Sequence, residues 1–178
     1  MEINNQILDE FYKKYANSNW IAKRNVVEAS FKNLKVINSI NIGITVAVVD
    51  FVYSTQITKF KKHITFAEMV DKIINLDVIN RTKVYDDKIV GELADCNSIN
   101  LFSFASKYCS LCNRYLHNKD DYSMYDKRVK TFLPKCVKHM RKNNSNIKAL
   151  KKQDIINYRR YRFIWQCCTQ QIFTHRYR

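Results

Sequence analysis

The sequence predicts an all-α protein. Its 178 residues include only two glycines and one proline, whereas sandwiches, barrels and Rossmann-like folds need turn glycines. Hydrophobic residues make up 46% of the chain and aromatic residues 13%, so the chain can bury a real core and differs from a disordered basic tail. The length fits one domain, and neither a repeat nor a convincing domain boundary divides residues 1–178.

Apolar residues at helical spacing predict the helices of the first half. Residues 5–15 form an amphipathic pattern, and residues 26–36 repeat it. Residues 40–52 are rich in β-branched side chains, and we interpret them as a buried helix, with a strand as the alternative. Thr65 is followed three residues later by Glu68, a capping box that predicts a helix running to residue 76.

The second half of the chain continues the helical pattern. Helices are predicted over residues 86–94, over residues 98–116 as one long helix or a helix pair, over residues 127–133 and over residues 154–173. Asp126 directly precedes the third of these and is expected to cap its N-terminus.

The charge is strongly basic and lies mainly near the C-terminus. The chain has 31 Lys+Arg and 16 Asp+Glu, for a formal net charge of +15. Residues 135–178 hold twelve basic residues and one acid, Asp154, with aromatic residues interleaved. This pattern favours a polyanionic partner, because each phosphate contact releases condensed counterions. A solvated helical face is the alternative, and a membrane surface is disfavoured because the aromatic residues look more like core.

The cysteines indicate a reducing compartment. No secretory signal is recognised, and the most apolar stretch, residues 40–53, is interrupted by Asn41 and Asp50. Six cysteines without such a signal predict reduced thiols and therefore a cytoplasmic protein. We expect a monomer that needs no cofactor and has no membrane partner.

Lys107 is the most distinctive candidate for chemistry. It lies in an apolar and aromatic string over residues 102–109, where desolvation lowers the pKa of an amine and makes the neutral nucleophile available. Asp126 follows nineteen residues later, where the N–H groups and the dipole of a helix N-terminus hold a carboxylate ionised. An ordinary surface lysine and a simple N-cap explain the same two residues without any chemistry.

The pair and its flanking aromatic residues resemble the catalytic lysine and aspartate of the helix-hairpin-helix DNA glycosylase superfamily, especially its 8-oxoguanine glycosylase branch. The strings SFASKY over residues 103–108 and FVYSTQI over residues 51–57 are similar to a bacterial group of small proteins with an 8-oxoguanine-glycosylase-like fold. The resemblance covers residues 48–133. One departure is clear, because the glycines of the family hairpin are missing from residues 97–103.

The resemblance implies a two-lobed helical bundle with a central cleft. It also implies a DNA glycosylase with AP lyase activity, located at the nucleoid and acting on duplex DNA that contains a modified or damaged base. The base would leave the stack. Lys107 would attack the anomeric carbon to form a Schiff base, and Asp126 would stabilise the positive charge that develops on the sugar.

Candidate DNA contacts lie beside this pair and in the basic C-terminal region. They are Gln56, Lys127, Arg128, Lys138, Arg141, Lys142, Arg159, Arg160 and Arg162. For residues 53–56, however, we favour ordinary polar capping at the C-terminus of a helix.

Two other functions remain open. The first is a non-catalytic nucleic-acid-binding protein with the same fold. The second is a zinc-stabilised interaction module, because Cys109, Cys112, Cys136 and His139 form a Cys-x2-Cys and Cys-x2-His pattern. Against zinc, residues 106–116 read as continuous helix without turn glycines, and cysteine is a common buried residue.

Overall fold

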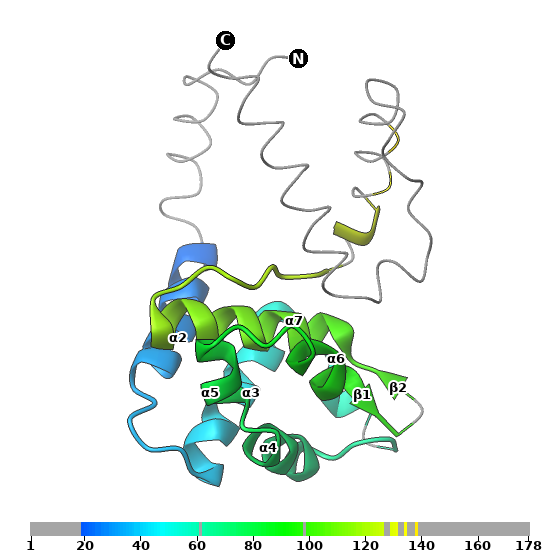
Figure 1. Ribbon diagram of the computed structural model, residues 1–178, viewed down its shortest axis with the longest axis horizontal. Helices are drawn as coiled ribbons and strands as arrows, with labels where there is room; N and C mark the ends of the chain where they lie inside the picture. Colours follow the sequence, from blue (N-terminus) through cyan, green and yellow to red (C-terminus); the bar gives the residue numbers. More distant parts are fainter. Residues whose placement is uncertain are drawn as a thin grey trace.

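The computed structural model describes residues 19–60, 62–97, 99–126 and 129–131, together with Pro134 and Lys138. Helices connected by short loops make up most of these residues, and one two-stranded hairpin accompanies them (Figure 1). The prediction of a mainly helical protein is confirmed, and the hairpin is the departure from it. The helices expected over residues 5–15 and 154–173 lie outside the described residues.

The first two described helices pack against each other. They are α2 (Asn19–Lys32) and α3 (Ser39–Tyr53). Helix α3 confirms the buried helix expected over residues 40–52, and the side chain of Asn38 caps it by accepting a 2.8 Å hydrogen bond from the Asn41 N–H. Helix α2 begins and ends earlier than the predicted range 26–36.

A short 3₁₀ helix, η1 (Ile57–Phe60), leads to α4 (Phe66–Asn75). The predicted capping box of α4 is confirmed: the Glu68 N–H donates to Thr65 Oγ1 at 3.2 Å, and Glu68 Oε2 accepts from the Thr65 N–H at 2.6 Å. Helix α5 (Val78–Lys83) follows as a separate short helix, which the sequence patterns did not predict.

The next elements are two helices joined by the hairpin. Helix α6 (Ile89–Ala94) leads into β1 (Asp95–Cys96), which pairs antiparallel with β2 (Ile99–Asn100), and α7 (Phe102–Leu111) follows. Helices α6 and α7 also pack against each other. The prediction that a helix starts at residue 98 is therefore wrong. Strand pairing occupies the first residues, and the Asn100 side chain accepts the Phe102 N–H at 3.0 Å.

Asn97 lets the hairpin turn without glycine. Its φ is 36°, in the left-handed region that asparagine tolerates better than most residues. Its side-chain Nδ2 donates to the His63 carbonyl at 3.1 Å, and His63 Nδ1 donates back to the Asn97 carbonyl at 3.1 Å. The turn is thus bound to the loop that follows η1.

Replacing Asn97 by alanine is expected to lower the free energy of unfolding by about 1–2 kcal/mol, because alanine strains the left-handed conformation. Glycine at the same position removes the side-chain bond without that strain, so Asn97→Gly should be the more stable variant. Chemical denaturation of both variants measures the difference. Equal stability of the two would contradict the assigned turn conformation.

Helix α7 lies at the centre of the described core. All its residues except Ser103 are buried. The ring of Tyr108 contacts Phe31 and Phe104, each at a centroid distance of 5.5 Å, and its hydroxyl shares a 2.8 Å hydrogen bond with Thr45. Among the described residues, every helix falls short of the length and apolarity that crossing a bilayer requires.

Candidate functional site

A stripe of polar side chains runs along α7 and the turn that follows it. These residues recur at spacings of three and four, as one face of a helix requires, and we call them the polar stripe: Ser103, Ser106, Lys107, Ser110 and Asn113. A polar face on a buried helix must find hydrogen-bond partners. The segment of residues 121–126 supplies them.

The polar stripe binds the backbone of residues 121–126. Ser110 Oγ donates to the Tyr122 carbonyl at 3.0 Å, and Ser103 Oγ donates to the Tyr125 carbonyl at 3.2 Å. Ser106 Oγ accepts the Tyr125 N–H at 3.0 Å. These bonds set the position of the chain immediately before Asp126 relative to Lys107.

Asn113 binds the beginning of the same segment. It lies in η2 (Cys112–Leu116), a π-helical turn that ends the regular α-helix predicted to continue to residue 116. Its Nδ2 donates to the Thr82 carbonyl at 2.8 Å, and its Oδ1 accepts the Asp121 N–H at 2.8 Å. Turns of this kind are frequent at functional sites, because they place a side chain differently from a regular helix.

Lys107 is a buried amine. The residue is only 5% exposed, and its Nζ donates a hydrogen bond to Ser103 Oγ at 2.6 Å. Burial lowers the pKa of Lys107, and the charge of Asp126 partly opposes this effect. The amine is therefore easier to deprotonate than a surface lysine.

Asp126 is a half-buried carboxylate at the start of a helical turn. Its Oδ1 accepts the Val129 N–H at 2.8 Å, and its carbonyl accepts the Lys130 N–H at 2.9 Å. The predicted N-cap is thus confirmed. The ion pairs found among the described residues do not include Lys107 with Asp126, so the carboxylate acts on the amine through space.

Lys107 and Asp126 together offer two complementary chemical functions. The neutral form of a buried amine is a nucleophile toward electrophilic carbon. A carboxylate held by backbone N–H groups stabilises positive charge nearby. The ring of Phe102 packs edge-on against Tyr125 at a centroid distance of 5.2 Å, which adds an apolar contact beside the two groups.

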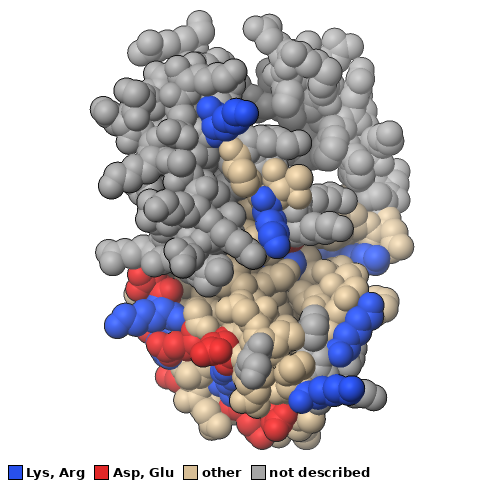
Figure 2. Space-filling view, turned by 90° about the vertical axis from the view of Figure 1, so that its right-hand side faces the viewer, with Lys and Arg blue, Asp and Glu red and all other residues tan. Residues whose placement is uncertain are grey.

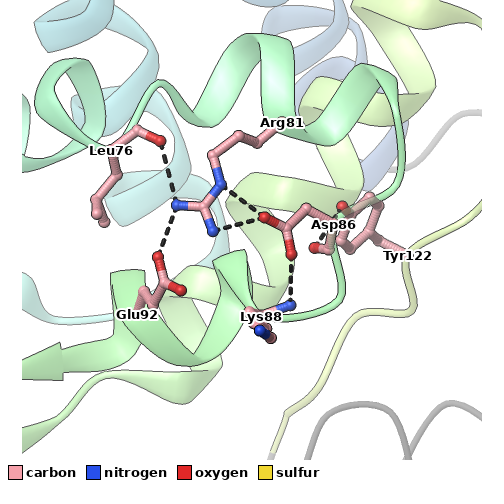
Figure 3. Close-up of polar contacts among 6 residues, drawn as sticks. All are labelled: Leu76, Arg81, Asp86, Lys88, Glu92 and Tyr122. Carbon is pink, nitrogen blue, oxygen red and sulfur yellow. Dashed lines mark hydrogen bonds and ion pairs between the residues drawn. The ribbon is translucent and has the colours of Figure 1, made fainter.

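Arg81 supports the N-terminal end of the segment of residues 121–126 through Asp86 (Figure 3). Its guanidinium donates to Asp86 Oδ2 from Nε at 2.7 Å and to Glu92 Oε2 from Nη1 at 2.6 Å. The Asp86 carbonyl in turn accepts from the Tyr122 hydroxyl at 2.8 Å. The bond to Glu92 raises the pKa of Arg81 and lowers the pKa of Glu92. This cluster connects α5 and α6 to the chain that leads to Asp126.

The cysteines of the zinc alternative that are described lie in the core. Cys109 and Cys112 are fully buried, and burial raises the pKa of both thiols, which disfavours the thiolate form that binds metals. Cys136 and His139 lie outside the described residues. Within residues 19–126 and the few described positions beyond them, no group of three or more metal-binding side chains occurs.

The predicted DNA contacts are described only in part. Gln56 is exposed and follows Ser54, the C-cap of α3, so the interpretation of residues 53–56 as a helix C-terminus is confirmed. Lys138 is exposed. The remaining candidates lie outside the described residues: Lys127, Arg128, Arg141, Lys142, Arg159, Arg160 and Arg162.

Comparison with known proteins places the chain in a family. No curated protein and no solved structure matches it. One family model, described as HI_0787_N, N-terminal domain, matches residues 3–121, about two thirds of the 178 residues. Lys107 lies inside the matched range, and Asp126 lies just beyond it. The chain therefore belongs to the HI_0787_N N-terminal domain family.

Proposed function

We propose that the protein is a DNA glycosylase with AP lyase activity that excises a modified base from duplex DNA. The observation that carries this proposal is the buried amine of Lys107, whose pKa is lowered. Lys107 belongs to the polar stripe, and Ser103 and Ser106 of that stripe bind the segment bearing Asp126. We assign α6, the hairpin and α7 to the helix-hairpin-helix element of a two-lobed glycosylase fold, and we expect its cleft to form beside Lys107.

The reaction begins when the target nucleotide leaves the base stack, because its glycosidic bond is inaccessible within a duplex. The neutral amine of Lys107 then attacks the anomeric carbon of the sugar. The bond between that carbon and the base breaks, and the base leaves with the bonding electrons and takes up a proton. Asp126 stabilises the positive charge that develops on the sugar during this step.

The covalent intermediate explains the lyase activity. After attack, the nitrogen of Lys107 loses one of its two protons to solvent or to the departing base. Its lone pair then forms the C=N bond of a protonated Schiff base at the former anomeric carbon, while the bond from that carbon to the ring oxygen breaks and the ring oxygen takes up a proton. The Schiff base acidifies the neighbouring carbon, so β-elimination breaks the strand on the 3′ side. Hydrolysis of the Schiff base then releases the enzyme.

Borohydride trapping tests the proposal. Purified protein is mixed with duplexes that each contain one modified base or one abasic site, and the Schiff base is reduced to a stable amine. We expect a covalent protein–DNA adduct with the wild type and none with Lys107→Gln. Absence of an adduct across a broad panel, with DNA binding intact, would refute the enzyme and favour the non-catalytic binding protein.

A further inference from the structure

The loop between α3 and α4 is basic and is held in a defined position. We call residues 57–64 the basic loop. No acidic residue occurs from position 51 to position 67, whereas lysines occupy positions 59, 61 and 62. Ile57 and Ile64, at its two ends, are buried in the core, while Lys59, Lys62 and His63 between them are exposed. Lys59, Lys62 and His63 therefore lie on the surface between two apolar anchors.

The acids that flank the basic loop have their carboxylates engaged in capping bonds. Asp50 Oδ1 accepts from the Thr55 hydroxyl at 2.6 Å and from the Ile57 N–H at 2.9 Å. On the other side, the Glu68 carboxylate accepts from Thr65 in the capping box of α4. Neither acid forms an ion pair with Lys59 or Lys62 among the contacts of the described residues.

The basic loop is bound to the hairpin. The two hydrogen bonds between His63 and Asn97, each 3.1 Å long, connect the loop to the turn between β1 and β2. Lys72 of α4 adds a contact, because its Nζ donates to the Asp95 carbonyl in β1. These bonds connect the loop to the hairpin, and α7 starts directly after β2.

Charged side chains are unevenly distributed over the face drawn in Figure 2. Most of the basic side chains lie in its right-hand and upper parts, whereas the acidic side chains gather at the left and at the bottom, with a few basic side chains among them. Exposed lysines whose flanking acids are engaged in capping bonds favour a polyanion over a mixed protein surface.

We propose that the basic loop is a phosphate-binding site for the nucleic-acid backbone, in which Lys59 and Lys62 contact consecutive phosphates. The identity of the partner rests on the proposed function. Phosphate contacts position a protein on a duplex without reading its sequence.

The salt dependence of DNA binding tests this site. The full chain and the double variant Lys59→Gln/Lys62→Gln are titrated with an undamaged duplex at salt concentrations from about 50 to 200 mM. Loss of two phosphate contacts should weaken binding on the order of tenfold and lower the slope of log K against log salt by about 1.8. The matched control is Lys35→Gln/Lys83→Gln, which removes the same charge from exposed lysines outside the loop and the hairpin and should leave the slope unchanged.

The outcomes separate this site from the proposed enzyme. A slope change confined to the loop variant, without a trapped adduct in the wild type, supports the phosphate site and refutes the glycosylase. A trapped adduct together with equal slopes for the loop variant and its control overturns the phosphate site alone. The site is also overturned if the wild type does not bind DNA. Binding to vesicles of phosphatidylserine and phosphatidylcholine is measured in parallel, and the site is overturned if the loop variant loses binding to the vesicles but not to DNA.

Discussion

Lys107→Met is expected to abolish base release and trapping while making the protein more stable. Methionine has a similar length but no charge, so the variant loses the nucleophile and the cost of burying an amine. Activity should fall by at least about a thousandfold, as for other nucleophiles. The free energy of unfolding should rise by about 1–2 kcal/mol, because the amine has only Ser103 as a hydrogen-bond partner and no direct ion pair among the described residues.

The stability difference between Lys107→Met and the wild type should depend on pH in a defined direction. Burial lowers the pKa of Lys107 below its ordinary value of 10.5, so the unfolded chain binds the proton more tightly than the folded protein. Below the folded-state pKa, burial of the charged amine therefore lowers the free energy of unfolding of the wild type by its full amount. This destabilisation disappears as the pH rises through the folded-state pKa toward 10.5. Thermal unfolding of both proteins from about pH 7 to 10.5 should show the difference shrinking.

The exposed Lys83 supplies the control for this experiment. Lys83→Met makes the same substitution at an exposed position, so it measures how much of any change comes from losing a surface lysine alone. If Lys107→Met is instead less stable than the wild type at pH 7, the amine contributes to the fold, and the buried nucleophile is the wrong interpretation.

Asp126→Asn is expected to lower activity by about 10²- to 10⁴-fold with little change in stability. Asparagine caps a helix about as well as aspartate, so it can still accept the Val129 N–H but carries no charge. Because Asp126 raises the pKa of Lys107, its removal should also move the pH profile of trapping to lower pH. Single-turnover cleavage across pH measures both effects.

Comparing Asp126→Ala with Asp126→Asn separates the role of the charge from the role of the helix cap. Alanine removes both, so this variant should unfold about 1 kcal/mol more easily than Asp126→Asn. Their activities should be equally low if the charge is what matters. An asparagine variant with wild-type activity would reduce Asp126 to a structural cap.

Local patterns in the sequence predicted the helices that local interactions determine. The capping box of Thr65 and Glu68, the buried helix α3 and the N-cap at Asp126 are each encoded within a few residues, and the structure confirms them. The hairpin was missed because strands of two residues are too short to show an alternating pattern. Helix α5 was missed because its six residues span less than two turns.

The candidate site could be predicted only in part. Lys107 was recognisable because a lysine is unusual in an apolar string, and Asp126 because it precedes a helix. The polar stripe was missed, although Ser103, Ser106 and Ser110 recur at helical spacing. Its partners are backbone groups of residues 121–126, and contacts at that separation depend on how the chain folds back.

The role of Lys107 as nucleophile is tested by identifying the residue that carries the trapped DNA. The reduced adduct is digested with protease and nuclease, and the modified peptide is sequenced by mass spectrometry. We expect a single modified peptide with the sugar remnant on the Nζ of Lys107. A remnant on any other lysine or on the N-terminal amine, with Lys107 unmodified, would contradict it.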